Sequence, residues 1–294
     1  MFESNMNIHK AVKAVSAADP AMAEIIKRAG PFQPPPSRGD PFGYLAQAIM
    51  FQQLAGRAAQ AIHGRFVQAI GGRVTPQAVL AVTPEVLRTA GLSGNKTASI
   101  IDLATKATDG TVPLDRLGEL DDEEVISRLS TVRGIGRWTS EMFLMFELER
   151  LDVWPVEDFG VRNGWTLLHS LPEMITPRQL QLEGDRFRPY RTIAAWYCWQ
   201  AVRVLRGEMA LPDSTSAGAP TTRTATGASG TRVSAPAPQR AASETCVRIR
   251  SGVRQSQTSV TPRGSARTWF ACRHGWLRRH SCLADLQWLQ TESG

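Results

Sequence analysis

The sequence feature that most constrains the fold is a recurring pair in which Asp or Thr directly precedes proline. The pairs are Asp19-Pro20, Asp40-Pro41, Thr75-Pro76, Thr83-Pro84 and Thr176-Pro177. The oxygen of a short Asp or Thr side chain accepts a hydrogen bond from a free N–H group at the start of a helix. Proline at the first helical position loses no intrahelical hydrogen bond. Each pair therefore predicts the start of a helix.

The apolar residues between these pairs are also spaced as in helices. Leu45, Ala48 and Ile49 lie three and four residues apart, which places their side chains on one helix face. Glycines that can end helices stand at positions 30, 71 and 91, and strand-like alternation is missing. Residues 1–212 are therefore predicted to be all-α, with roughly ten helices. Because residues 40–70 are too long for one ordinary helix, we predict a junction near "QQLAG" (52–56).

Charge and composition divide the chain at Pro212. Residues 213–294 are rich in small and polar residues and carry 11 arginines, no lysine and 4 acids. This segment accounts for the whole formal charge of +7, so residues 1–212 are formally neutral. The high isoelectric point is therefore no evidence that the helical region binds nucleic acid, which would require a local basic patch. The composition predicts that residues 213–294 form a disordered, low-complexity basic tail.

The positions of the cysteines argue against a disulfide-bonded fold and against an iron–sulfur protein. Cys198 is the only cysteine among residues 1–212, so no disulfide framework and no iron–sulfur cluster is expected there. The tail contains Cys272, His274, His280 and Cys282, but their spacing fits no common zinc finger, and we favour an extension without a metal site. We find no signal-peptide core and no membrane-length apolar run. A cytoplasmic protein without membrane segments is expected.

The stretch "TVRGIGRWTSEMF" (131–143) predicts a tight hairpin at residues 130–138. Gly134 and Gly136 can adopt backbone angles that other residues resist, which allows a very short turn between two helices. The first N–H groups of the second helix lack partners and can hold a phosphate, and Arg133 and Arg137 add positive charge. An ordinary turn between two helices explains the same residues.

Trp138 and Asp158 each have two interpretations. Trp138 forms an apolar stripe with Met142, Met145 and Phe146, which favours a core position. Asp158 lies in "LDVWPVEDFGVRNGW" (151–165), where its carboxylate either caps a helix or takes part in chemistry. Glu157 is the competing carboxylate.

Taken in order, several segments resemble the helix-hairpin-helix (HhH-GPD) DNA glycosylase superfamily, and most closely 3-methyladenine DNA glycosylase II. They are "FQQLAGRAA", "GLSGNKTASIIDLA", "VRGIGRWTSEMFLMF", "DVWPVEDFGVR" and "PYRTIAAWYCW". The resemblance covers most of residues 10–210. It implies two helical lobes with a cleft between them.

The resemblance also implies roles for single residues around the reacting base. Asp158 matches the catalytic aspartate, and Trp138 stands where bifunctional members have a Schiff-base lysine. Tyr190 and Met142 line the base pocket with Trp138. Met142 replaces an aromatic residue of some members, which leaves the base preference open.

Other implied roles concern contacts with DNA. Leu54 matches the wedge that fills the gap left by a flipped nucleotide, with Gln53 beside it; from the apolar pattern alone Leu54 is an ordinary core leucine. The implied hairpin contacts are Arg133, Gly134, Gly136, Arg137 and Thr139. Arg133 replaces a proline of many members. The carbonyls of Ser130, Val132 and Ile135 match those that hold a structural Na⁺ or K⁺.

The predicted function is base-excision repair. A cationic N-alkylated purine leaves without an enzyme acid, so one carboxylate is enough where ordinary sugar hydrolysis uses two. With no lysine at 138, and with Lys96 and Lys106 away from that position, we expect a monofunctional glycosylase with a water nucleophile. It would remove 3-methyladenine and 7-methylguanine from double-stranded DNA, as a monomer and with no cofactor for the chemistry. The alternatives are a non-catalytic helix-hairpin-helix DNA-binding module and a glycosylase for another lesion such as hypoxanthine.

Overall fold

The computed structural model describes residues 5–207, and every regular element in that range is helical. The elements are α1 (Asn5–Ala18), α2 (Pro20–Ala29), α3 (Pro41–Phe51), α4 (Gly56–Ala69), α5 (Pro76–Leu80), α6 (Pro84–Thr89), α7 (Gly94–Thr108), η1 (Leu117–Glu119), α8 (Asp122–Ser130), α9 (Arg137–Phe146), α10 (Phe159–Leu168), α11 (Pro177–Gly184), η2 (Asp185–Phe187) and α12 (Arg191–Leu205). The all-α prediction is confirmed. The tail at 213–294 and its Cys/His group lie outside the described residues.

The predicted helix boundaries agree with the structure. All five Asp-Pro and Thr-Pro pairs begin helices, and in four of them the side chain accepts a backbone hydrogen bond; Thr83 is the exception. The three glycines follow the ends of α2, α4 and α6 and have positive φ angles. The predicted junction separates α3 from α4.

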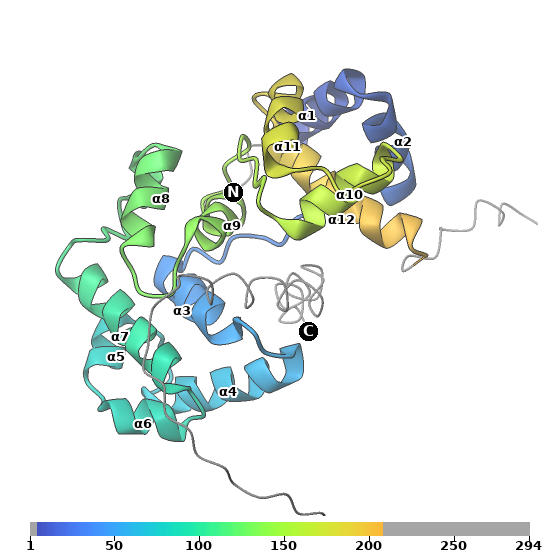
Figure 1. Ribbon diagram of the computed structural model, residues 1–294. Helices are drawn as coiled ribbons and strands as arrows, with labels where there is room; N and C mark the ends of the chain where they lie inside the picture. Colours follow the sequence, from blue (N-terminus) through green and yellow to red (C-terminus); the bar gives the residue numbers. More distant parts are fainter. Residues whose placement is uncertain (1–4, 208–294) are drawn as a thin grey trace, which may run out of the picture. The chain divides into compact units, whose positions relative to one another are not determined.

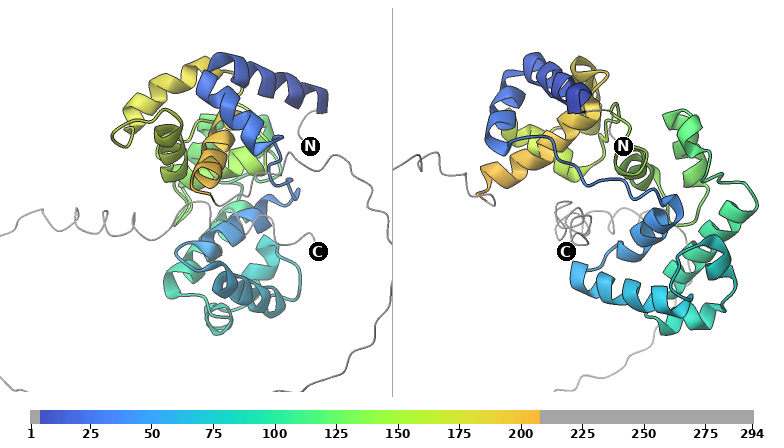
Figure 2. Two further views of the ribbon diagram at one scale, coloured as in Figure 1. Left: turned by 90° about the vertical axis from the view of Figure 1, so that its right-hand side faces the viewer. Right: turned by 180° about the vertical axis from the view of Figure 1, so that it is seen from behind.

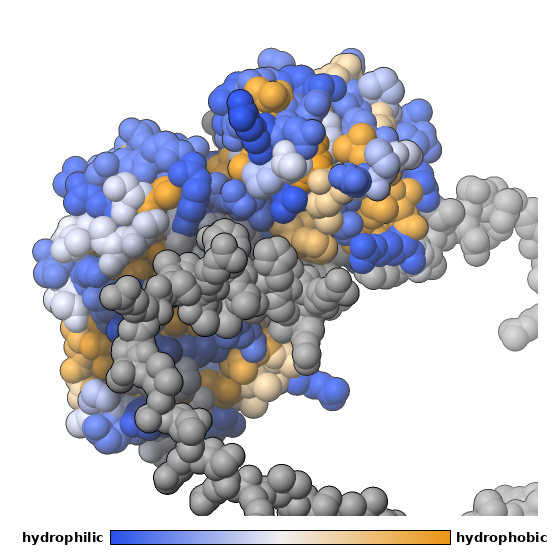
Figure 3. Space-filling view, viewed as in Figure 1, coloured by the Kyte–Doolittle hydropathy of each residue, from blue (hydrophilic) through white to orange (hydrophobic). Residues whose placement is uncertain are grey.

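Contacts divide the helices into two groups (Figures 1 and 2). In one group α12 packs on α10, α2 and α1, with α11 and η2 beside them. In the other, α3 packs on α4, α7 and α9, while α5 and α6 pack on α7 and α8 packs on α9. The surface over α8, whose first turn is acidic, is strongly hydrophilic (Figure 3). No helix of the described part is long and apolar enough to span a membrane.

Two glycines one turn apart let α10 and α12 pack closely. A Cβ atom at Gly164 would lie 1.9 Å from the carbonyl oxygen of Cys198, and one at Gly160 would lie 2.6 Å from Cδ1 of Trp199. Both distances are far below van der Waals contact, so a side chain at 164 would push the α12 backbone away and one at 160 would displace the Trp199 indole. The start of α10 and the middle of α12 are thereby held together.

Candidate active site

Asp158 is the N-cap of α10. Its Oδ1 accepts a hydrogen bond from the backbone N–H of Val161 at 2.7 Å, so the helix-cap interpretation is confirmed. The side chain is only 1% exposed. Glu157, the competing carboxylate, is exposed. A buried, oriented carboxylate is therefore found at Asp158.

Two tryptophans donate hydrogen bonds to the Asp158 carboxylate. The indole N–H of Trp138, on the first turn of α9, donates to Oδ2 at 2.7 Å. The indole N–H of Trp199, on α12, donates to Oδ1 at 2.9 Å. Indole N–H groups are donors only, so these two rings fix the orientation of the carboxylate from two helices.

Trp199 is a site residue that sequence reasoning did not find. It is 1% exposed and lies against Phe146, with ring centroids 5.9 Å apart. The sequence feature that could have indicated this contact is the pair Gly160 and Gly164. Because glycine has no side chain, α12 can pack closely against α10 at these two positions. Without the structure, "WYCW" in α12 offers no way to choose which tryptophan faces Asp158.

The residues expected in the base pocket lie on α9 or at the start of α12, the two helices that carry Trp138 and Trp199. Trp138 is half-buried and packs at the edge of the core, so it is not a fully buried core residue. Met142 is buried on α9, and its carbonyl accepts a hydrogen bond from the Tyr44 hydroxyl. Tyr190 is half-buried and is the N-cap of α12. Their contact with a damaged base stays a prediction.

A second acidic side chain, Glu141, is buried on α9 one turn after Trp138. It is 5% exposed and accepts a hydrogen bond from Nε of Arg137 at 3.1 Å. Burial raises the pKa of Glu141 to about 7; Arg137 opposes the rise, and the negative charges of Asp158 and Glu123 add to it. This group therefore changes charge near neutral pH.

The hairpin turn, residues 131–136, joins α8 to α9. Gly134 has φ +80°, in the left-handed region that favours glycine. Gly136 has φ −116° and ψ −179°, an extended conformation open to any residue. The expectation that both glycines supply unusual backbone angles is therefore wrong for Gly136. Gly136 is the N-cap of α9 and offers no side-chain cap, so the first N–H groups of α9 remain available for an anion.

The basic and polar residues of the hairpin already have protein partners. The guanidinium of Arg137 contacts the carboxylates of Glu123 and Glu141. Arg133 donates from its guanidinium to Asn95 at 3.1 Å. Thr139 is buried, so only its backbone is suited to an anion at the start of α9. The positive charge that the sequence places beside the turn is therefore partly compensated, and phosphate contacts at these residues stay predictions.

The expected cation site consists of backbone carbonyls, the donor type that suits a monovalent ion. The Val132 carbonyl accepts the N–H of Ile135 at 3.1 Å within the turn and retains a second lone pair for a metal. Binding of Na⁺ or K⁺ by the carbonyls of Ser130, Val132 and Ile135 stays a prediction. Within residues 5–207, no cluster of three or more His, Cys, Asp or Glu side chains is arranged to hold a metal.

The α3–α4 loop, residues 52–55, carries the expected wedge. Gln53 is exposed with φ +60°, an unusual value for a residue other than glycine. Leu54 is half-buried and packs at the edge of the core. Leu54 is therefore not a fully buried core leucine, and its role as a wedge stays a prediction.

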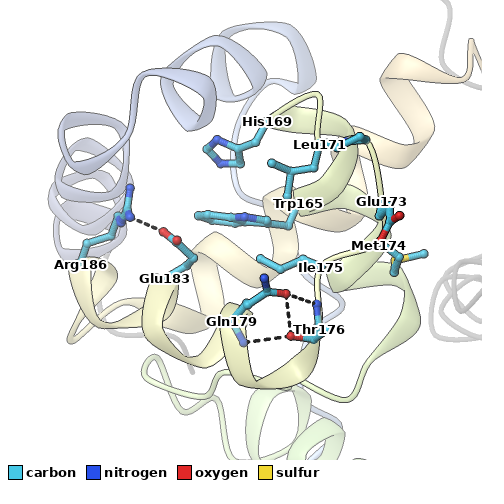
Figure 4. A pocket seen from close by; sticks show the side chains of 11 residues that line it. Trp165, His169, Leu171, Glu173, Met174, Ile175, Thr176, Gln179, Glu183 and Arg186 are labelled. Carbon is cyan, nitrogen blue, oxygen red and sulfur yellow. Dashed lines mark hydrogen bonds and ion pairs between the residues drawn. The ribbon is translucent and has the colours of Figure 1, made fainter.

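A separate cavity of about 570 Å³ lies at the far end of α10. The Trp165 indole lies in the middle of the lining residues, with its ring centroid 4.1 Å from that of His169 and 6.0 Å from the Arg186 guanidinium carbon (Figure 4). None of the residues expected at the active site or on DNA lines this cavity. The cavity is therefore distinct from the site around Asp158, because Asp158 lies at the opposite end of α10.

Comparisons with known proteins agree with this geometry. Residues 46–189 match the model of the HhH-GPD superfamily of base excision DNA repair proteins. DNA-3-methyladenine glycosylase 1 of Schizosaccharomyces pombe is 35% identical over 203 residues, which cover 67% of this chain and 89% of the relative.

Two solved structures are similar over most of their length. The 3-methyladenine DNA glycosylase of S. pombe in complex with abasic DNA has 36% identity and a TM-score of 0.58, covering 65% of this chain and 95% of that one. A DNA-3-methyladenine glycosidase of Bacillus halodurans has 35% identity and a TM-score of 0.64, covering 70% and 93%. The chain belongs to the HhH-GPD superfamily of base excision DNA repair proteins.

Proposed function

We infer that this protein is a base-excision repair DNA glycosylase that acts on alkylated purines, and that it hydrolyses the bond between base and sugar without cutting the strand. The observation that carries this proposal is the buried Asp158 carboxylate, held by the indoles of Trp138 and Trp199. The names of the relatives, DNA-3-methyladenine glycosylases, support the substrate class. The proposed lesions are 3-methyladenine and 7-methylguanine.

In the proposed reaction the enzyme first rotates the damaged nucleotide out of double-stranded DNA. The bond to be broken is not reachable inside the duplex, and rotating the nucleotide out costs a few kcal/mol. An apolar side chain in the vacated stack offsets part of that cost. Leu54 takes this role, with the exposed Gln53 beside it.

The hairpin would hold the DNA backbone while the base is flipped. Its donors would be the backbone N–H groups of Gly134 and of residues 136–139, with Arg133 and Arg137 nearby. A phosphate at the uncapped start of α9 gains from these N–H groups and from the helix dipole. A Na⁺ or K⁺ ion would be held by the carbonyls of Ser130, Val132 and Ile135. These contacts fix the position of the protein on DNA and carry no sequence information.

The chemistry then requires one carboxylate. When the base departs, the sugar acquires positive charge, which a fixed negative group in a dry environment stabilises strongly. Asp158 supplies that charge and orients or deprotonates the attacking water. An alkylated purine is already cationic, so it leaves without a proton, and its stacking on Trp138 and Tyr190 contributes roughly 0.5–2 kcal/mol per contact. Met142 completes the pocket.

A water nucleophile is proposed because, within residues 5–207, the groups bonded to the Asp158 carboxylate are two indole N–H groups and a backbone N–H rather than an amine. The residue at 138 is tryptophan, which cannot form an imine. The ammonium group of Lys96 is bound to the carbonyls of Met50 and Gln52, and that of Lys106 is bound to Asp102 and Thr131. The working form in this proposal is a monomer that acts on DNA in the cytoplasm.

Asp158→Asn tests the chemistry. We expect its rate of base release from alkylated DNA to fall by at least ~100-fold, because the fixed negative charge is lost, while affinity for DNA survives. Glu157→Gln is the matched control, since it removes a neighbouring exposed carboxylate; its rate should stay near wild type. Heating or alkali after incubation reveals the abasic sites. Near-normal excision by Asp158→Asn would refute the mechanism, and a wild-type chain that binds DNA without excision would instead be a non-catalytic module.

Borohydride trapping tests the absence of strand cleavage. We expect no covalent enzyme–DNA adduct and no strand break before heat or alkali treatment. A trapped adduct would show that an amine attacks the sugar. A panel with 3-methyladenine, 7-methylguanine and hypoxanthine in the same duplex would rank the lesions.

A further inference from the structure

One face of α7 contacts both segments that the proposed function places on DNA. Lys96, Ser99 and Asp102 follow one another at three-residue spacing, so their side chains lie along one side of the helix. Asn95 and Lys106 flank this row on the same side. We call these five residues the α7 platform. Lys96 contacts the α3–α4 loop, and the other four residues contact the hairpin turn.

Lys96 holds the α3–α4 loop. Its ammonium group donates to the carbonyl of Met50 at 2.6 Å and to that of Gln52 at 2.7 Å. These carbonyls belong to the end of α3, where backbone acceptors lack helical partners and a cation is favoured. Burial lowers the pKa of Lys96. Lys96 therefore fixes the backbone at Gln52. Gln53, whose φ angle lies in the left-handed region, is the next residue, and Leu54 follows it.

The rest of the platform holds the hairpin turn. Asp102 accepts the backbone N–H of Arg133 at 2.7 Å, and Lys106 donates to the carbonyl of Thr131. Ser99 lies directly against Gly134, since a Cβ atom there would be 2.9 Å from the serine hydroxyl. The hairpin turn is therefore seated on the helix that holds the other loop.

A direct hydrogen bond joins the two segments. The side-chain amide of Gln52 donates to the carbonyl of Gly134 at 2.9 Å. The backbone carbonyl of Gln52 is one of the two that Lys96 binds. The α3–α4 loop, the hairpin turn and the α7 platform therefore form a closed set of contacts.

We propose that Lys96 is a positioning residue for nucleotide flipping, because it fixes Leu54 at a set distance from the hairpin that holds the DNA backbone. The inference rests on the proposed function. A wedge enters the base stack effectively only if its distance from the anchored phosphates is fixed before binding, since a 1 Å misplacement is enough to weaken catalysis strongly. In this inference Lys96 acts through Leu54 and not on the base or the sugar.

The test compares two duplexes that differ in the cost of flipping. In one the alkylated purine is paired normally; in the other it lies opposite an abasic analogue, where less pairing must be broken. For Lys96→Met we expect kcat/KM to fall about tenfold on the paired duplex, which corresponds to ~1.4 kcal/mol, and to change little on the other. In a Leu54→Ala background, Lys96→Met should add little, because the wedge through which it acts is gone.

Controls separate positioning from general stability. Lys27→Met removes an exposed lysine on α2 and should leave both rates unchanged. If Lys96→Met does not fold, as judged by its thermal unfolding, Lys96→Gln, which removes the charge but keeps a polar side chain, carries the same test. Equal losses on both duplexes, or full additivity with Leu54→Ala, would overturn the inference. A wild-type chain that excises neither substrate would instead overturn the proposed function.

Discussion

Glu141 combines burial with an ionisable group beside the proposed catalytic carboxylate. Its pKa is raised from 4.5 to about 7, first by burial. A carboxyl group that ionises less readily in the folded state favours unfolding as the pH rises. The penalty is absent below pH 4.5, where both states are protonated, and complete above pH 7. At about 1.4 kcal/mol per pKa unit, the rise from 4.5 to about 7 corresponds to roughly 3 kcal/mol.

Glu141→Gln should therefore change the pH dependence of stability. Relative to this variant, the wild type is expected to lose stability between pH 4.5 and pH 7, since glutamine cannot ionise. Thermal unfolding of both proteins at several pH values gives the difference directly and cancels the other titrating groups. A difference in Tm that stays constant over that interval would contradict the raised pKa.

At the scale of elements, the packing of α10 on α12 decides whether the site exists. Gly164 meets backbone of α12, which cannot move aside alone, whereas Gly160 meets the indole of Trp199, a side chain that can rotate. The two glycines thus affect different properties. A methyl group at 164 forces the helices apart, and one at 160 displaces the hydrogen-bond donor of Asp158.

Gly164→Ala is expected to lower stability by at least ~2 kcal/mol, because overpacking strains both helices, and Tm by roughly 5 °C or more. In Gly160→Ala, the excision rate should fall by a larger proportion than the free energy of unfolding. Gly64→Ala is the control: it lies in α4 with open space around it and should stabilise the protein slightly. Calorimetry and single-turnover excision measure the two effects. A fully stable Gly164→Ala protein would refute the close approach of the helices.

At the scale of the whole molecule, the formal charge of +7 belongs to residues 213–294, while the proposed site lies between residues 53 and 199. The residues that match the superfamily model, 46–189, also precede the tail. We therefore expect the chemistry of base release to depend on the helical region and the tail to add only charge-dependent affinity for DNA, which falls with salt.

A chain ending at Pro212 should release alkylated bases at the wild-type single-turnover rate when DNA is saturating. Its DNA affinity should depend less steeply on salt if the tail arginines contact phosphates. The two quantities are measured with the same labelled duplex at several salt concentrations. A severe loss of the saturating rate would show that the tail contributes to catalysis.

The helical fold was predictable because its signals act over a few residues. A capping oxygen reaches a backbone N–H two or three positions away, and proline and glycine restrict or free their own backbone. Asp158 was predictable as a cap for the same reason, whereas its catalytic role, inferred from the order of the family segments, stays a prediction. Gly136 shows the limit, because its φ angle is ordinary even though its place in "GIG" suggested otherwise.

The amino-acid sequence alone was therefore enough to predict an all-helical fold, several helix ends and the resemblance of the segments to a DNA glycosylase. The groups that surround Asp158 became known only from the way the helices pack. Trp199 reaches it from 41 residues away, and the charge of Arg137 is taken up by Glu123 on another helix. Such contacts depend on how closely helices pack, and packing is set by the shapes of many side chains together rather than by any local pattern.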